Sequence, residues 1–418
     1  MNTAHQSASS SKAGASAASS VVSKQSRLTS LDIFRGLVIL VMTFVNFLSP
    51  VKSIPGWAKH MPESVDGFTF VDVVFPGFLF IVGVAIPLAL QRRIDRGEAM
   101  RNIIASIFVR TAGLLFVGVV MVNKGLYSGD VAWLSRPLWY LLAMSSIVLF
   151  WIHCPANAST LRRRVIRTLQ VSAAVLLAIL LILFRGKNAA SQTVWMQHSW
   201  WGILGMIGWA YLICSFSWLA FRRNSAALLG IMGFMFALYI GGRHGALNWL
   251  GPVQNFVNVG IMFGSNSATV MMGLLVGNLL LNASIGLGEK VRSMLLLAVA
   301  LGVSGLVLRP LHGFNKSAHT ESYALITGGI CCFLFALVFY LVEVRRWQRW
   351  GGFLIPIGQN ALFAYVVPGI VGNSFILAGS TAYLSDTGVA GAWSAALLTA
   401  LVMLMTTVLS RMDIKLKL

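Results

Sequence analysis

Long apolar runs follow one another along almost the whole chain and are separated by short polar segments. An α-helix needs about 17 to 25 mostly apolar residues to cross the hydrocarbon layer of a membrane. Twelve runs of roughly this length can be placed, near residues 31–50, 70–91, 103–123, 137–153, 166–184, 200–220, 226–241, 267–283, 292–308, 324–342, 354–375 and 391–409. The pattern predicts an all-α, multi-pass bundle of transmembrane helices. The expected number of helices is about 11 to 12, because the shortest runs need not all span the membrane.

The distribution of Lys and Arg predicts the orientation of these helices. With the amino terminus inside, 21 of these residues fall in inner segments and nine in outer segments. Both termini are therefore expected in the cytoplasm. The same topology places five of the seven histidines outside, namely His60, His198, His244, His312 and His319. Histidine exchanges protons near neutral pH, so the outer face carries most of the candidate chemistry.

Composition supports a protein of the lipid bilayer and argues against other classes. Hydrophobic residues make up 57% of the 418 residues and charged residues 11%, and the mean hydropathy is +0.78. A net charge of +20 is explained by the basic inner segments, so no nucleic-acid partner is expected. Residues 1–26, rich in Ser and Ala, are interpreted as a disordered cytoplasmic tail, with a cleaved targeting peptide as the alternative. Residues 27–418 are expected to form one transmembrane domain.

Neither cysteines nor histidines indicate a metal site. The four cysteines lie in or beside apolar runs and form no C-x-x-C pair, which is typical of buried thiols that pack as small apolar groups. The outer histidines are scattered over separate loops. We therefore expect no metal cofactor.

A histidine and an aspartate lie at the mouth of the second apolar run. His60 precedes Asp72 by 12 residues, and Thr69 with Asp72 has the T-x-x-D spacing of a helix capping box. A neutral imidazole can act as a general base or as a nucleophile toward a thioester, and a nearby carboxylate would orient it. The alternatives are a water-facing loop histidine and a purely structural cap.

Three further polar groups are singled out within or beside apolar runs. Asp32 and Arg35, three residues apart, can pair at the inner end of the first helix. Arg35 then either snorkels toward the interface or holds an anionic cofactor group. Asn46, near the outer end of this helix, can polarise a carbonyl or bond to a neighbouring helix. Asn360 lies inside an apolar run, so its amide needs a partner in the protein or in a cavity.

Four segments resemble transmembrane acyltransferases related to heparan-α-glucosaminide N-acetyltransferase. They are RLTSLDIFRGLVILVMTFVN at 27–46, KH followed by GFTFVDVVFPGFLFIVGVAIPL at 67–88, NKSAHTESYAL at 315–325 and IGQNALFAY at 357–365. The resemblance implies that His60 is the essential histidine, that Asn46 acts near it, and that Asp72 is the aspartate of the D-x-x-F-P motif. It also implies acetyl-CoA as the cytoplasmic acyl donor. We expect Arg35, Asp32 and Asn360 to bind this donor.

The third segment is expected to bind the acceptor, through Asn315, Lys316, His319, Thr320 and Tyr323. The positions occupied by Ala318, His319 and Glu321 depart from the usual family pattern. The acceptor therefore need not be glucosamine.

These observations predict an inner-membrane acyltransferase that moves an acetyl group to an amino or hydroxyl group of a saccharide at the periplasmic face. An acetyl-His60 intermediate and direct transfer with His60 as general base are both open. The alternatives are a transporter or flippase for an envelope glycan or lipid precursor, in which the outer histidines and Asp72 bind protons, and an inactive partner subunit. Helix-packing glycines serve contacts within and between chains alike, so a homo-oligomer stays open.

Overall fold

The computed structural model describes residues 28–416 apart from 130–132, 156–157 and 381–386. The tail predicted at 1–26 lies outside these residues. The described helices are α2 (Thr29–Leu48), α3 (Val74–Asp95), α4 (Met100–Asn123), α5 (Arg136–Phe150), α6 (Thr160–Ile182), α7 (Ile203–Phe221), α8 (Ser225–Arg243), α9 (Gly251–Phe256), α10 (Ser267–Leu281), α11 (Leu287–His312), α12 (Glu321–Phe339), α13 (Ile355–Gln359), α14 (Ala361–Leu377) and α16 (Gly388–Arg411).

Short irregular elements extend or connect these helices. Four are 3₁₀ turns, η1 (Gly56–Ala58), η2 (Phe70–Val73), η3 (Asn248–Leu250) and η6 (Arg349–Leu354), and two are π-helical, η4 (Gly260–Asn266) and η5 (Tyr340–Val344). Two short strands, β1 (Gly186–Lys187) and β2 (Thr193–Val194), pair antiparallel. The all-α fold class predicted from the sequence is confirmed.

Each of the twelve predicted runs coincides with a helix. Among the described residues, ten helices are long and apolar enough to span a membrane, and α13 with α14 would make an eleventh span that is broken by a 77° bend. The remaining run forms α5, which has only 15 residues. The protein is therefore a multi-pass membrane protein.

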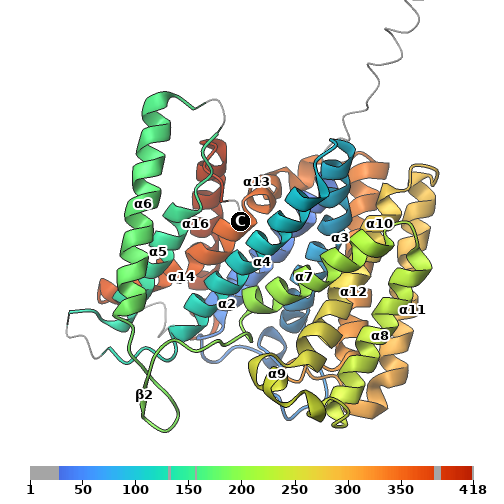
Figure 1. The fold of residues 1–418 in the computed structure, drawn as a ribbon, viewed down its shortest axis with the longest axis horizontal. Helices are drawn as coiled ribbons and strands as arrows, with labels where there is room; N and C mark the ends of the chain where they lie inside the picture. Colours follow the sequence, from blue (N-terminus) through green and yellow to red (C-terminus); the bar gives the residue numbers. More distant parts are fainter. Residues whose placement is uncertain (1–27, 130–132, 156–157, 381–386, 417–418) are drawn as a thin grey trace, which may run out of the picture.

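The helices form two groups joined by long central helices (Figure 1). Helices α5, α6, α14 and α16 lie on the left of the view, α8, α10, α11 and α12 lie on the right, and α4 and α7 run obliquely between them. Helix α3 packs along α10, α11 along α12 and α4 along α7. Helix α4 also contacts α5 on the left, and α7 contacts α10 on the right, so the central helices have neighbours from both groups.

The contact between α3 and α10 is close because both helices present glycine there. A Cβ atom at Gly83 would overlap the carbonyl oxygen of Val270, and one at Gly273 would overlap that of Phe80. Small residues let helix backbones approach closely in a membrane, where no hydrophobic force drives helices together. This contact fixes α3, whose first turns carry the candidate site.

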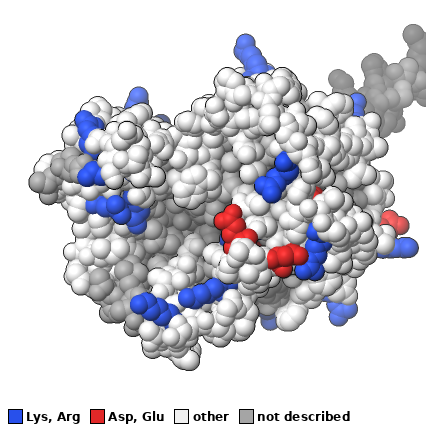
Figure 2. Space-filling model, turned by 90° about the horizontal axis from the view of Figure 1, so that it is seen from below, with Lys and Arg blue, Asp and Glu red and all other residues white. Residues whose placement is uncertain are grey.

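We call the two ends of the bundle the inner and outer faces, following the orientation expected from Lys and Arg. The lower end in Figure 1, where α9 and β2 lie, is the outer face. Seen from that side, a few acidic side chains gather near the middle of the molecule beside a hollow, and basic side chains are spread more widely (Figure 2). The segment between α2 and α3 and the loop between α11 and α12 meet at this face.

Candidate active site

The site is built on the 3₁₀ turn that opens α3. Thr69 and Asp72 form the predicted capping box, in which Asp72 Oδ2 accepts the backbone N–H of Thr69 at 2.9 Å. The same oxygen accepts the N–H of Met61 at 3.1 Å. Because two backbone donors hold Oδ2, the second oxygen of this fully buried carboxylate points in a fixed direction. The predicted capping box is therefore confirmed, and it is compatible with a functional role for the other carboxylate oxygen.

The second carboxylate oxygen contacts His60. Asp72 Oδ1 lies 2.7 Å from His60 Nδ1. The His60 side chain is 45% exposed, whereas that of Asp72 is 0% exposed. One edge of the imidazole thus rests on a buried carboxylate, and the side chain as a whole reaches solvent. This is the arrangement in which a carboxylate orients a histidine and stabilises its protonated form.

Lys316 completes a triangle with these two residues. Its Nζ lies 2.7 Å from His60 Nδ1, 3.4 Å from His60 Nε2 and 3.4 Å from Asp72 Oδ1. Burial lowers the pKa of Lys316, while the Asp72 carboxylate acts in the opposite direction. A lysine, a histidine and an aspartate therefore lie within hydrogen-bonding or ion-pairing distance of one another at one point of the outer face.

Asp72 and Lys316 compete for the same ring nitrogen. If Nδ1 carries the proton and donates it to Asp72, Nε2 keeps a free lone pair and can act as a base or nucleophile. If Nδ1 instead accepts a hydrogen bond from the Lys316 ammonium, the proton of a neutral ring sits on Nε2, which then has no free lone pair. The protonation state of Lys316 thus bears directly on the reactivity of His60.

The other residues expected to bind the acceptor mainly build the loop that carries Lys316. Asn315 Nδ2 donates to the carbonyl of Glu63 at 2.6 Å, and Thr320 caps α12. Tyr323 donates its hydroxyl to the backbone carbonyl of Asp72 at 2.6 Å. His319 packs edge-on against Phe75, with ring centroids 5.8 Å apart. These contacts bring the loop to His60 from the far end of the sequence.

Asn46 is not brought into this triangle. It lies on the last turn of α2 with an exposed side chain. Among the described residues it forms no hydrogen bond with His60 or Asp72. Its role near the histidine therefore stays a prediction.

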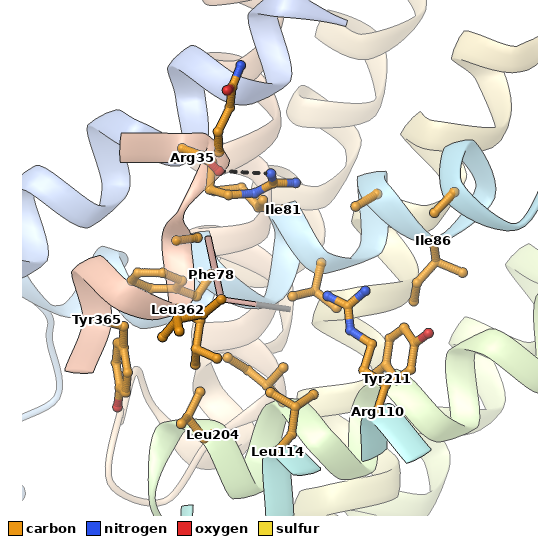
Figure 3. A pocket seen from close by; sticks show the side chains of 18 of the residues that line it. Arg35, Phe78, Ile81, Ile86, Arg110, Leu114, Leu204, Tyr211, Leu362 and Tyr365 are labelled. Atoms are coloured by element: carbon orange, nitrogen blue, oxygen red, sulfur yellow. Dashed lines mark hydrogen bonds between the residues drawn. The ribbon is translucent and has the colours of Figure 1, made fainter. Parts of the chain in front are cut away.

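A separate cavity of about 370 Å³ lies deeper in the bundle (Figure 3). Its lining is mostly apolar, with Phe78, Leu362 and Tyr365 gathered on one side of the view. Two arginines from different helices also reach it, Arg35 of α2 and Arg110 of α4. Phe78 follows Asp72 by six residues, which corresponds to about 9 Å along a helix. The cavity therefore begins about one and a half turns of α3 inward from the carboxylate.

The two arginines are held differently. Arg35 Nη1 donates to the carbonyl of Gly358 at 3.1 Å, the bond drawn in Figure 3, and lies 3.5 Å from Asp32 Oδ1 as predicted. The Arg110 guanidinium lies over the ring of Tyr211, 4.9 Å from its centroid. Arg110 was not selected from the sequence, although an arginine within an apolar run is itself a signal of function.

Asn360 does not line the cavity, and its side-chain amide binds the C-terminal segment of the chain. It lies at the break between α13 and α14. Its Nδ2 donates to the carbonyl of Ile414 at 3.0 Å, and its Oδ1 accepts the N–H of Leu416 at 3.1 Å. Both ends of the amide thus hold the C-terminal segment, and the Leu416 side chain lines the cavity. Binding of a cofactor by Asn360 itself stays untested.

Within the described ranges, no three His, Cys, Asp or Glu side chains are placed to hold a metal ion.

Comparison with known proteins places these features in a family. The model of a family described as "Domain of unknown function (DUF5009)" matches residues 27–259, which is more than half of the chain. The chain belongs to the DUF5009 family. The matched region contains His60, Asp72 and both cavity arginines, whereas Lys316 lies beyond it.

The chain is also similar to two mammalian proteins. It is 34% identical over 111 residues to heparan-alpha-glucosaminide N-acetyltransferase of Mus musculus, covering 27% of this chain and 16% of that relative. It is 34% identical over 107 residues to the protein of the same name from Homo sapiens, covering 26% of this chain and 15% of the relative. The matched segments thus span about one sixth of the length of these relatives.

Proposed function

We propose that this protein is an acyltransferase of the inner membrane that moves an acetyl group from cytoplasmic acetyl-CoA to an amino or hydroxyl group of a saccharide at the periplasmic face. The observation that carries the proposal is the exposed His60, whose Nδ1 lies 2.7 Å from the buried Asp72 carboxylate. The mammalian relatives are N-acetyltransferases by name, which supports the same class of reaction.

The arginine-lined cavity suits the acyl donor. Guanidinium groups recognise phosphate through paired N–H donors, and Arg35 and Arg110 supply two of them. The apolar lining suits the acyl-pantetheine arm, which carries the thioester. Because the cavity begins about 9 Å from Asp72 along α3, an arm extended from it would point its thioester toward His60.

Two reaction sequences satisfy the geometry. In direct transfer, His60 Nε2 removes a proton from the acceptor amine or hydroxyl as that group attacks the thioester carbonyl, and coenzyme A leaves as its thiolate. In the two-step sequence, Nε2 attacks the carbonyl, the C–S bond breaks, and coenzyme A leaves as its thiolate. The acceptor then attacks the acetyl-imidazolium, the N–C bond breaks, and the acceptor proton passes to the released Nε2. In both sequences Asp72 stabilises the imidazolium that forms.

The test uses the purified protein in maltoside detergent with acetyl-CoA labelled in the acetyl group. The expected result is binding of the label, with transfer to glucosamine or a glucosamine oligosaccharide that is lost in His60→Ala. The matched control is His244→Ala, which removes another exposed histidine expected on the outer face. Label retained on the protein only when His60 is present indicates the two-step sequence. Normal transfer by His60→Ala, or no binding of acetyl-CoA, would refute the proposal.

A further inference from the structure

A second cavity lies near the inner face, where α3, α7 and α10 end and α8 begins. Its volume is about 860 Å³. The polar residues of its lining that bear on binding are Asp95, Arg222, Arg223, Ser225, Asn278 and Asn282. None of these residues lines the cavity that holds Arg35 and Arg110. It is therefore a separate site, to which the proposed acyl transfer assigns no role.

Arg222 brings an unsatisfied positive group to this cavity. Its Nη1 is buried and has no hydrogen-bond partner among the residues that the structure describes. Leaving a buried charged donor without an acceptor costs more than an ordinary lost hydrogen bond. The neighbouring Arg223 adds a second guanidinium to the lining and is exposed. Two adjacent arginines, one with a buried free donor, favour an anionic ligand.

The hydrogen bonds between side chains around the cavity occupy their acceptor oxygens and leave several of their N–H and O–H donors available to a ligand. Asn278 Oδ1 accepts the indole N–H of Trp218 at 3.1 Å, and Ser225 Oγ accepts from Asn278 Nδ2, also at 3.1 Å. The Ser225 hydroxyl can therefore donate its own proton to a ligand. Asn282 Oδ1 accepts the N–H of Ser284 at 3.0 Å, so the Asn282 amide nitrogen remains as a donor.

The lining also holds one carboxylate. Asp95 is exposed, and its Oδ1 accepts from Gln91 Nε2 at 2.7 Å. This acidic group opposes an anion and lies on α3, whereas the two arginines follow one another at the end of α7. The cavity still has more donors than this single carboxylate, from Arg222, Arg223, Ser225 and Asn282. A ligand that matches this set presents several acceptor oxygens and a negative charge.

We propose that this inner-face cavity binds a phosphate group through Arg222 and Arg223, with Ser225 and Asn282 as further donors. A guanidinium pair and neutral N–H and O–H donors are the groups with which proteins recognise phosphate. Two sources share this chemistry. One is the headgroup of an anionic phospholipid in the inner leaflet, and the other is the phosphate of a soluble nucleotide.

The test compares these two sources in the full-length protein purified in maltoside. Native mass spectrometry measures binding of dioctanoyl phosphatidylglycerol, and calorimetry measures binding of adenosine 3′,5′-bisphosphate. The test variant is Arg222→Gln with Arg223→Gln, and the control is Arg164→Gln with Arg167→Gln, which removes the same charge from α6. We expect one of the two probes to bind at least 10-fold more weakly to the test variant and unchanged to the control.

Each outcome decides something. Loss of lipid binding alone assigns the site to a headgroup, and loss of nucleotide binding alone assigns it to a soluble phosphate. If the test and control variants weaken binding of a probe equally, the cause is general attraction to a basic face, and the proposal is overturned. The proposal is also overturned if neither probe binds the parent protein. A misfolded variant is recognised by a melting temperature below that of the parent, measured without ligand. For the test variant we expect a melting temperature at or above that of the parent, because one buried N–H donor without a partner has been removed.

Discussion

Replacing Asp72 by asparagine tests how the histidine is controlled. The side chain keeps its shape but has one acceptor oxygen and one NH₂ group. The backbone N–H groups of Met61 and Thr69 donate to Oδ2 of Asp72 at 3.1 and 2.9 Å. In the variant, these two donors require the amide oxygen to occupy the Oδ2 position. The NH₂ group then faces His60 Nδ1 at the position of Oδ1.

This reversal changes which nitrogen of His60 carries the proton. Nδ1 must now accept, from the new NH₂ group or from Lys316, whose Nζ lies 2.7 Å away. The proton moves to Nε2, which loses the lone pair needed for base or nucleophilic chemistry. In a Ser-His-Asp triad, the same substitution lowers turnover by about 10⁴ through the wrong tautomer. We expect a loss of about 10³ to 10⁴ here, equivalent to about 4 to 5 kcal/mol in the activation barrier.

The assay is release of coenzyme A from acetyl-CoA with glucosamine as the acceptor probe. Because the donor cavity begins about 9 Å away along α3, the KM for acetyl-CoA should change less than about threefold, a shift of under 1 kcal/mol. The control is Asp66→Asn, an outer-face aspartate that keeps an acceptor for the N–H of Phe314. Turnover of Asp72→Asn within 10-fold of the parent would refute control of the tautomer by Asp72.

Three further predictions concern packing, pH and the donor cavity. Gly83→Ala should destabilise the protein by at least about 1 to 3 kcal/mol, because the added Cβ would overlap the Val270 carbonyl. The measurement is the melting temperature, which should fall. Gly230→Ala, where the added Cβ meets open space, should leave the melting temperature unchanged. Burial of the ring, together with Lys316, lowers the pKa of His319 to about 4. The unfolded chain therefore takes up a proton that the folded one excludes, and stability should fall by about 3 kcal/mol from pH 6.5 to 4. His319→Asn, which suits the positive φ of 53°, should flatten that dependence, and an unchanged slope would contradict it. Arg110→Gln should raise the KM for acetyl-CoA by about 10-fold, if one phosphate contact of about 1.5 kcal/mol is lost, with kcat within twofold; an unchanged KM would exclude Arg110 from donor binding.

The sequence predicted the helices better than the constellation at the outer face. Apolar runs of spanning length are a local signal, and all twelve proved helical. The pairing of His60 with Asp72 was also within reach, because both residues lie on one short segment at a helix start. Lys316 was placed with the acceptor residues, since nothing local indicates that a residue 256 positions from His60 lies against its ring.

Asn360 and Arg110 show the same limit of prediction from the sequence. The amide of Asn360 needed a partner, but the C-terminal segment that supplies it is 54 residues away. Arg110 reaches the same cavity as Arg35 only because α4 packs along α7, whose Tyr211 supports the guanidinium. Long-range packing decides such contacts, and a single sequence does not encode them in any readable pattern.

Under the proposed function, acetyl groups cross the membrane through this protein at His60. The direct measurement uses proteoliposomes with labelled acetyl-CoA supplied only outside and a glucosamine oligosaccharide trapped only inside. We expect labelled oligosaccharide in the lumen with the parent protein and with His244→Ala, and none with His60→Ala. Lumenal product with His60→Ala, or product formed only where donor and acceptor share a compartment, would contradict it.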